Sequence, residues 1–119
     1  MNNTATQIDK NRNSEKLFDL LKTGSEEFLP EILQIIEEGF ESDFKKNDWN
    51  LLHLAVQDGG NPDVVDKLIS AGVDPTEKTD EGLDALEMAI GNPLVRLMTN
   101  TSPNKEVIKI LSKEKEGKK

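Results

Sequence analysis

A short apolar pattern occurs twice along this chain, at a spacing typical of repeat proteins. Leu52-His53-Leu54-Ala55 and Leu86-Glu87-Met88-Ala89 are offset by 34 residues, and Gly39 and Gly72, which each follow an apolar helical segment, are offset by 33. A period of this size indicates a repeat built from a helix pair. One helix pair cannot bury both of its apolar faces, so such pairs must stack side by side. The sequence therefore predicts an all-α fold of stacked units.

Apolar residues at spacings of three and four predict the individual helices. We expect Ser14 to cap the first of them, which should be only about two turns long, Asn61 to cap the fourth, and Pro103-Asn104 to open the last. No segment alternates between apolar and polar residues for more than a few positions, so no independent strand is expected. The expected helices are 14–23, 26–38, 51–56, 62–70, 85–90 and 103–112.

The central copy of the pattern resembles an ankyrin repeat. It reads NLLHLA over Asn50–Ala55 and DVVDKLISAGVDP over Asp63–Pro75, and a weaker copy, DEGLDALEMA over Asp80–Ala89, keeps the turn glycine Gly82. The resemblance implies an all-α ankyrin-repeat solenoid of stacked helix-turn-helix units with hairpin-like fingers. It also implies a structural role for His53, which would hydrogen-bond to turn backbone and hold neighbouring repeats in register. The structural-motif residues expected on these grounds are His53, Gly39, Gly72 and Gly82.

The third unit departs most from the pattern. Ala55 to Val64 spans nine residues, whereas the equivalent Ala89 to Val107 spans eighteen, which places an insertion near residues 93–101. Insertions in repeat proteins map to loops, and this one is either a binding feature or a tolerated surface loop. The expected segments are a flexible polar leader over 1–13, an ankyrin-repeat domain over 14–112 with repeats at about 14–46, 47–79 and 80–112, and a basic tail over 113–119.

Negative charge is concentrated in the middle of the chain. The 119 residues, enough for one small domain, carry a net charge of −8, and the segment from Glu26 to Glu87 holds seventeen acidic residues against four lysines. This balance argues against non-specific binding to nucleic acid phosphates or to anionic membranes. A basic protein would be steered towards this segment, although the same charges could serve only to keep a small protein in solution.

The residue types needed for catalysis or metal binding are scarce. The chain has no cysteine, and His53 is its only histidine. Adjacent carboxylates such as Glu37-Glu38 point in different directions on a helix, and Gly59-Gly60 lacks the lysine and hydroxyl residue of a phosphate-binding loop. We therefore expect no catalytic residue, no cofactor and no metal. No apolar stretch approaches the roughly 20 residues that span a bilayer, and the start of the chain is polar, so we expect a cytoplasmic protein.

Two aromatic residues lie just before the central repeat helix. Phe44 and Trp49 have charged neighbours, and a partly exposed tryptophan is a common anchor of protein interfaces. Trp49 could instead fill space within the finger, and the sequence leaves both interpretations open. The predicted partner-binding residues are these two aromatics and eight acidic residues, Glu41, Asp43, Asp48, Glu77, Asp80, Glu81, Asp84 and Glu87.

These observations predict a non-catalytic protein-protein interaction module. The favoured hypothesis is a small acidic protein that binds and neutralises a basic protein partner, as an immunity protein or an inhibitor does. The alternative is a general adaptor or scaffold that binds through an apolar and aromatic patch. The lysine-rich end, residues 105–119, is the only support for nucleic-acid binding, and we expect neither nucleic acid nor membrane as a partner. A monomer or a heterodimer with the partner is expected, although three repeats are close to the minimum for stability, which leaves self-association open.

Overall fold

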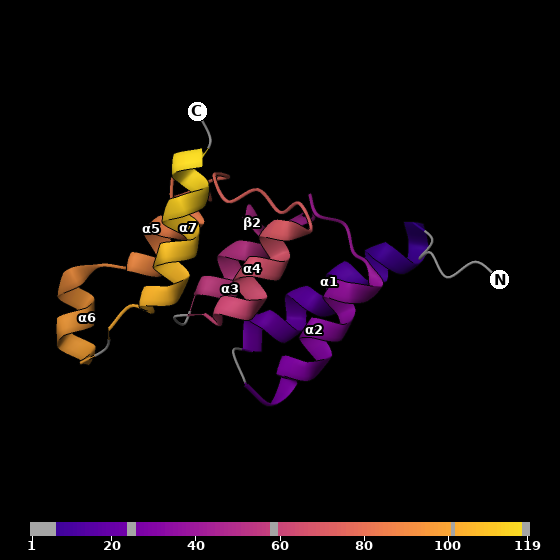
Figure 1. The fold of residues 1–119 in the computed structure, drawn as a ribbon, viewed down its shortest axis with the longest axis horizontal. Coiled ribbons are helices and arrows are strands. Elements are labelled where there is room, and N and C mark those ends of the chain that lie inside the picture. Colours follow the sequence, from indigo (N-terminus) through magenta and orange to yellow (C-terminus); the bar gives the residue numbers. More distant parts are fainter. Residues whose placement is uncertain (1–6, 24–25, 58–59, 101, 118–119) are drawn as a thin grey trace.

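The fold is mostly helical, and its helices stand side by side along the long axis of the molecule (Figure 1). The computed structural model describes residues 7–23, 26–57, 60–100 and 102–117. Its elements are α1 (Gln7–Thr23), η1 (Glu26–Phe28), α2 (Leu29–Glu38), β1 (Lys45–Lys46), β2 (Trp49–Asn50), α3 (Leu51–Val56), α4 (Pro62–Ser70), α5 (Ala85–Ile90), α6 (Pro93–Thr99) and α7 (Lys105–Gly117). None of these described helices is both long and apolar enough to cross a bilayer.

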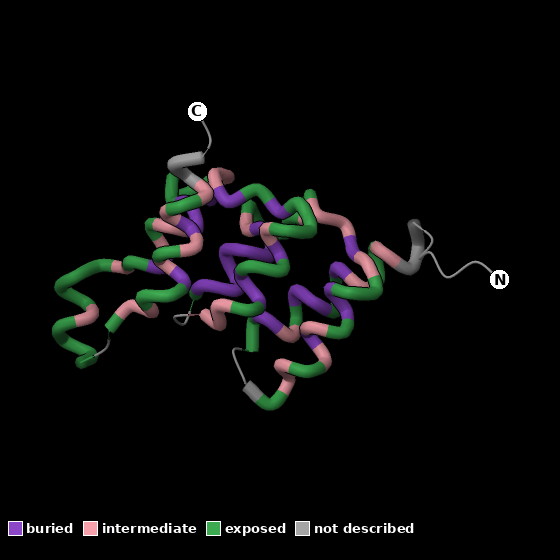
Figure 2. Tube along the Cα trace, viewed as in Figure 1, coloured by how far each residue is buried: buried purple, intermediate pink, exposed green. Residues whose placement is uncertain are grey.

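Three helix pairs follow one another along the chain. Helix α1 packs against α2, α3 against α4, and α5 against α7, while α1, α3 and α5 form one row and α2, α4 and α7 form the other. Ala85 and Ala89 are buried on α5, where their small side chains allow that helix to approach α3 closely. Burial is therefore continuous through the central helices, whereas α6 is almost entirely exposed (Figure 2).

The first helix is longer than the sequence predicts. Helix α1 begins at Gln7 rather than at Ser14, so the expected cap at Ser14 and the expected flexible leader are wrong for residues 7–13. Ser14 is fully buried inside α1, where its hydroxyl donates to the Lys10 carbonyl and accepts from the Glu41 backbone N–H, both at 2.8 Å. The bond with Glu41, in the segment after α2, holds in place a polar stretch of α1 that has few apolar residues of its own. The rest of the predicted leader, residues 1–6, lies outside the described residues.

Two further predictions of irregular chain are wrong. Residues 93–99 of the expected loop insertion form helix α6, because Asn92 accepts hydrogen bonds from the Leu94 and Val95 backbone N–H groups and Pro93 opens the first turn. Helix α7 continues to Gly117, so the expected basic tail is helical over 113–117. Residues 101, 118 and 119 lie outside the described part of the chain.

The helices of the repeat units are confirmed. Helices α3 and α5 have the predicted bounds, and α4 is capped by Asn61, whose side chain accepts from two backbone N–H groups of its first turn. Gly39 caps the end of α2, and Gly72 follows the residue that caps α4. Their φ angles are 114° and 109°, a backbone conformation that residues other than glycine rarely adopt. The sequence therefore located the repeat helices from periodicity and capping residues alone.

Two glycines with similar backbone differ in the room around them, and this difference can be tested. Gly60 and Gly82 have φ of 79° and 82°, but a Cβ on Gly60 would lie 2.7 Å from the Ala55 carbonyl oxygen, whereas nothing lies within 4 Å of one on Gly82. We expect Gly82→Ala to cost about 1 kcal/mol of unfolding free energy and Gly60→Ala about twice that or more, because Gly60→Ala adds a steric clash with backbone. Urea unfolding followed by circular dichroism measures both, and equal losses would contradict the packing around Gly60.

Candidate protein interface

The segment between α2 and α3 folds into a short β-hairpin, which we call the finger (residues 45–50). Strands β1 and β2 pair antiparallel, so that Lys46 lies opposite Trp49. Asn47 and Asp48 at its tip have φ of 57° and 67°, the left-handed backbone that a two-residue hairpin turn requires. Asn and Asp tolerate this conformation better than most residues, which lets the finger close without a glycine. The predicted hairpin-like finger is thus present in the central repeat.

His53 joins the finger to the turn before the next helix pair. Its Nδ1 accepts a hydrogen bond from the Asn50 backbone N–H, and its Nε2 donates to the Glu77 carbonyl oxygen, both at 2.9 Å. Because a carbonyl oxygen only accepts, Nε2 carries a proton. Because Nδ1 accepts a hydrogen bond, it carries none, so the imidazole is neutral. Burial lowers the pKa of His53 below its ordinary value of 6.5. Both ring nitrogens hold backbone in place, which is the role that the resemblance implied.

Asn50 makes a second set of contacts between the same two turns. Its Oδ1 accepts from the His53 backbone N–H at 2.9 Å, and its Nδ2 donates to the Asp74 carbonyl oxygen at 3.2 Å and to Glu77 Oε1 at 2.9 Å. The other carboxylate oxygen of Glu77 lies 3.3 Å from Lys45 Nζ on the finger. The Glu77 carboxylate therefore faces the protein itself, so its predicted contact with a partner would compete with these bonds.

The same arrangement recurs one repeat later with different residues. Asp84 accepts from the Glu87 backbone N–H at 2.8 Å, and Glu87 Oε1 accepts from the Asp84 backbone N–H at 2.9 Å, as Asn50 and His53 do 34 residues earlier. Asp84 is only 2% exposed, so its predicted role as a partner-binding residue is wrong. An acidic residue at a helix cap is buried because its carboxylate is already satisfied by backbone N–H groups. Glu87 stays exposed and lies 3.7 Å from Lys78 Nζ.

The two predicted aromatic anchors pack against different helices. Phe44 meets Phe18 of α1 edge-to-face with ring centroids 5.9 Å apart, and Lys46 Nζ lies 5.5 Å from the centroid of the Phe18 ring. Trp49 meets the His53 ring at 6.1 Å, also edge-to-face. Both aromatics are half-buried, so each combines packing against the core with a partly accessible ring. The structure supports the space-filling interpretation of Trp49 and leaves part of its ring for a partner.

Four of the predicted acidic residues are exposed at turns along one edge of the molecule. We call Asp43, Asp48, Asp80 and Glu81 the acidic finger edge; the finger and the turn before α5 lie on the same side of the helix stack (Figure 1). Glu41 is half-buried and accepts from Asn11 Nδ2 at 3.1 Å.

The lysines near this edge already have acidic partners. The pairs are Lys45 with Glu77, Lys46 with Glu15 and Lys78 with Glu87, at 3.3 to 3.7 Å. Within the described residues, no ion pair joins a lysine or arginine to Asp43, Asp48, Asp80 or Glu81. The acidic finger edge therefore keeps its negative charge facing solvent.

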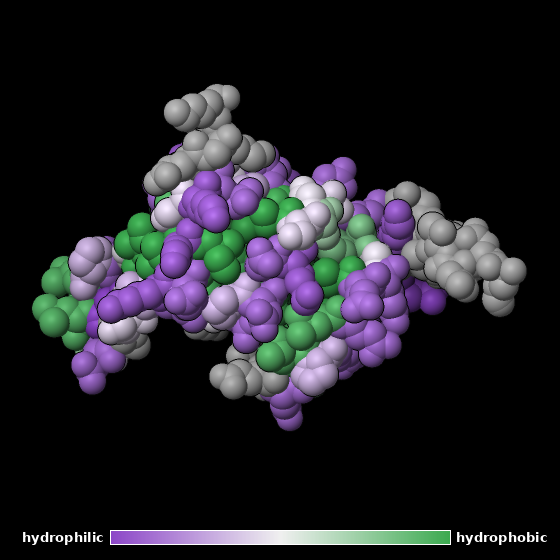
Figure 3. Space-filling model, viewed as in Figure 1, coloured by the Kyte–Doolittle hydropathy of each residue, from purple (hydrophilic) through white to green (hydrophobic). Residues whose placement is uncertain are grey.

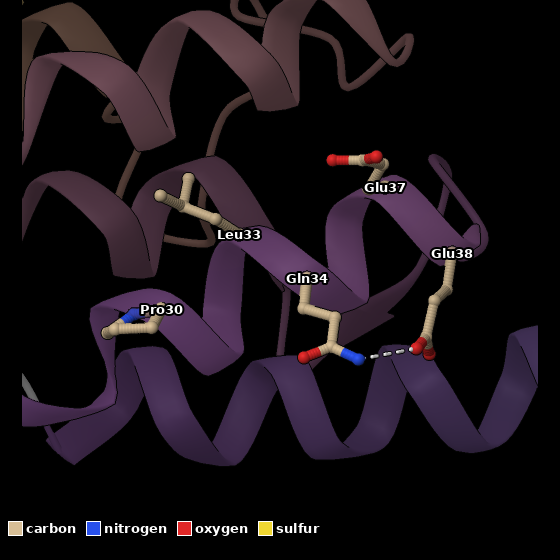
Figure 4. Close-up of a pocket in the computed structure, with 5 residues that line it drawn as sticks. All are labelled: Pro30, Leu33, Gln34, Glu37 and Glu38. Atoms are coloured by element: carbon tan, nitrogen blue, oxygen red, sulfur yellow. Dashed lines mark hydrogen bonds between the residues drawn. The ribbon is translucent and has the colours of Figure 1, made fainter.

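A hollow on α2 is a weaker candidate for a binding site. It is lined by Pro30, Leu33, Gln34, Glu37 and Glu38, and Gln34 Nε2 donates to Glu38 Oε2 at 3.1 Å across it (Figure 4). All five residues belong to one helix, so no second element encloses a ligand. Among the described residues, no cluster of three His, Asp or Glu side chains could hold a metal ion.

Sequence reasoning missed the structural role of Asn50, and it treated Glu77 only as a partner-binding residue, not as the acceptor of an Asn50 hydrogen bond. Asn50 directly precedes the apolar run of α3 and has His53 three residues later, which is the spacing of a capping box with histidine in place of glutamate. That signal was present in the sequence. The bonds to Glu77 and to the Asp74 carbonyl depend on how two repeats stack, and no local pattern indicates them.

The neutral state of His53 predicts a specific pH dependence. The folded protein resists protonation of this side chain, whereas in the unfolded chain it titrates near 6.5, so unfolding takes up a proton as the pH falls below 6.5. We expect the unfolding free energy to fall between about pH 7.5 and pH 5.5 by at most about 1.4 kcal/mol per pH unit. The variant His53→Gln should be less stable than the wild type at both pH values, and its unfolding free energy should no longer depend on pH in this way. If the variant kept the same dependence of unfolding free energy on pH, His53 would not be its cause, and the neutral state of His53 in the folded protein would be contradicted.

Removing the Asn50 side chain should cost more than removing an ordinary helix cap. Asn50→Ala leaves the buried His53 backbone N–H without its acceptor and removes two further bonds between repeats, so we expect a loss of about 3 kcal/mol. Asn61→Ala removes a cap that is local to α4 and should cost about 1 kcal/mol. Urea titrations of the two variants compare these costs, and similar losses would argue against the bridging role of Asn50.

Comparison with known proteins agrees with this geometry over the central part of the chain. Residues 47–80 match the family model of the ankyrin repeat, a segment that contains most of the finger, α3, α4 and the turn that receives the His53 and Asn50 bonds. No curated protein and no solved structure matches the chain. Residues 47–80 are therefore similar to an ankyrin repeat in sequence, and their helix pair and finger agree with that similarity.

Proposed function

We propose that this chain is a cytoplasmic, non-catalytic binding protein that binds and neutralises a basic protein partner through its acidic finger edge. The observation that carries the proposal is the division of charge at this edge. Lysines 45, 46 and 78 are paired with acidic side chains, whereas Asp43, Asp48, Asp80 and Glu81 are exposed at turns. A basic surface that approached the finger side would meet four exposed carboxylates that form no ion pair with a lysine or arginine among the described residues.

The ankyrin repeat supports the general part of the proposal. Repeats of this family act as protein-protein interaction modules, and here the His53 and Asn50 bonds fix the finger on the helix stack before any partner arrives. A surface that is already ordered loses little conformational entropy on binding. The finger side is therefore suited to rapid, rigid association.

Electrostatic attraction would act mainly on the rate of association. Exposed ion pairs contribute little to affinity one by one, but a cluster of like charges speeds the approach of an oppositely charged protein by roughly 10-fold to 1,000-fold at low salt. Screening over about 8 Å at physiological ionic strength reduces this effect. Salt sensitivity is therefore the property that distinguishes this proposal from its alternative.

The alternative is an adaptor or scaffold that binds through Phe44 and Trp49. The half-buried state of both rings favours it, because each ring is oriented by packing and keeps some accessible surface. Binding of this kind would depend on burial of apolar surface and would change little with salt.

The first experiment is affinity capture of partners from the native host at low and at high salt, followed by association kinetics with the captured protein. A variant with Asp43→Asn, Asp48→Asn, Asp80→Asn and Glu81→Gln should associate at least about tenfold more slowly at low salt. The control neutralises four exposed acidic residues on helices, with Asp19→Asn, Glu37→Gln, Asp66→Asn and Glu106→Gln, and should change the rate by less than about threefold.

The outcomes separate the two functions. A basic partner captured only at low salt, with slow association of the edge variant alone, supports neutralisation. Equal slowing by both variants would show that only net charge matters and would contradict a role for the acidic finger edge. A partner retained at high salt and lost with Trp49→Ala would establish the adaptor function instead.

A further inference from the structure

Helix α6 buries little of its surface against the rest of the molecule. From Asn92 to Asn100 every residue is exposed except Arg96, which is half-buried. The aliphatic side chains are exposed as well, and those of Leu97 and Met98 are 78% and 79% exposed. Helix α6 stands apart from the three helix pairs (Figure 1), and hydrophobic side chains gather at that end of the molecule (Figure 3). Burial of apolar surface therefore contributes little to holding this helix in place.

Arg96 makes a polar contact between α6 and α5. Its Nε donates to the Ile90 carbonyl oxygen at 2.6 Å, and its Nη2 donates to the Ala89 carbonyl oxygen at 2.8 Å. Both carbonyls belong to the last turn of α5, where no later residue of that helix can donate to them. The planar guanidinium has donors spaced to bind two neighbouring acceptors at once. One side chain therefore joins the two helices.

The chain leaves room for this guanidinium at Gly91. A Cβ on Gly91 would lie 2.7 Å from Arg96 Nε and 3.0 Å from its Nη2. Gly91 also has φ of 72°, a backbone conformation that favours glycine. A larger residue at this position would displace the Arg96 side chain and strain the backbone. Glycine therefore serves both the turn out of α5 and the contact with Arg96.

Both ends of the α6 segment are anchored on one helix pair, because α5 and α7 pack against each other. Before Gly91, Ala89 is buried on α5. After α6, Asn104 accepts from two backbone N–H groups of the first turn of α7, and its Nδ2 donates to the Gly60 carbonyl oxygen at 3.2 Å. Asn100, which ends α6, has left-handed backbone like Gly91, with φ of 55°. A movement of α6 between these two residues need not separate α5 from α7.

We propose that residues 91–100 form a hinged strap, in which α6 opens as a unit between Gly91 and Asn100 while the helix pairs stay folded, and that Arg96 is the latch that holds the strap closed. A helix of seven residues is too short to be stable by itself in water, so release of the latch would free the strap to move or to unwind. No residue of α6 is buried, so opening exposes little new apolar surface. Water can also replace the guanidinium at the Ile90 carbonyl, because that bond is exposed.

The latch sets how often the strap is open. Hydrogen bonds from a charged donor are stronger than those between neutral groups. Loss of both Arg96 bonds should therefore raise the ratio of open to closed strap roughly tenfold to 100-fold. In the closed strap, the exposed aliphatic side chains of α6 keep a fixed direction relative to α5, whereas in the open strap they sample a range of positions. The latch thus controls where the apolar side chains of α6 lie.

Distances between two spin labels, measured by pulsed electron paramagnetic resonance, test the proposal. The chain has no cysteine, so Leu97→Cys with Lys109→Cys places one label on α6 and one on α7, both at exposed positions. We expect one narrow distribution of distances, and Arg96→Met should raise the ratio of displaced to closed distances at least about tenfold. The control is Arg12→Met at an exposed position on α1, which removes the only other arginine and changes the net charge equally. It should leave the distribution unchanged.

A second pair of labels shows whether the helix pairs stay folded. Asp66→Cys with Lys109→Cys labels α4 and α7, which pack against each other, at exposed positions. We expect this α4–α7 distance to be the same with and without Arg96→Met.

Three outcomes would overturn the proposal. If Arg96→Met left the α6–α7 distance narrow and unshifted, Arg96 would not be the latch. If that distance were equally broad with Arg96 present, nothing would hold the strap closed. If the α4–α7 distance broadened together with the α6–α7 distance, α6 would not open independently of the helix pairs.

Discussion

The hydrogen bonds of His53 and Asn50 are the contacts on which the central part of this structure depends. They join the first turn of α3 to the turn between α4 and α5, and so fix both the finger and the offset between neighbouring helix pairs. The imidazole performs this role only while it is neutral, because a protonated Nδ1 could no longer accept the Asn50 N–H. A structural use of the only histidine therefore leaves the chain without its best candidate for acid–base chemistry.

Stacking of helix pairs also separates two kinds of surface. Turns and the finger lie on one side of the stack, where exposed carboxylates do not interfere with helix packing, whereas the aliphatic side chains of α6 are exposed. The charged side is suited to the attraction of an oppositely charged protein over a distance.

The sequence predicts a helix correctly where the residues that determine it lie close together in the chain. Helices α3, α4 and α5 were predicted because their apolar spacing and capping residues lie within a few positions of each other. The start of α1 was not predicted, because it depends on a hydrogen bond between the buried Ser14 and Glu41, 27 residues away. Asp84 was expected at the surface because it is acidic, but its place at a helix cap buries it.

The resemblance to an ankyrin repeat implied the structural role of His53, whereas the sequence by itself determined the repeat period, the mostly helical character and the concentration of acidic residues in the middle of the chain. These properties follow from short-range spacing and from composition, which need no knowledge of distant contacts. Only the tertiary structure decided which carboxylates face solvent, which lysines are already paired, and that α6 is held by Arg96 with its apolar side exposed. The reason is physical: burial and ion pairing depend on which residues from distant segments meet when the helix pairs stack.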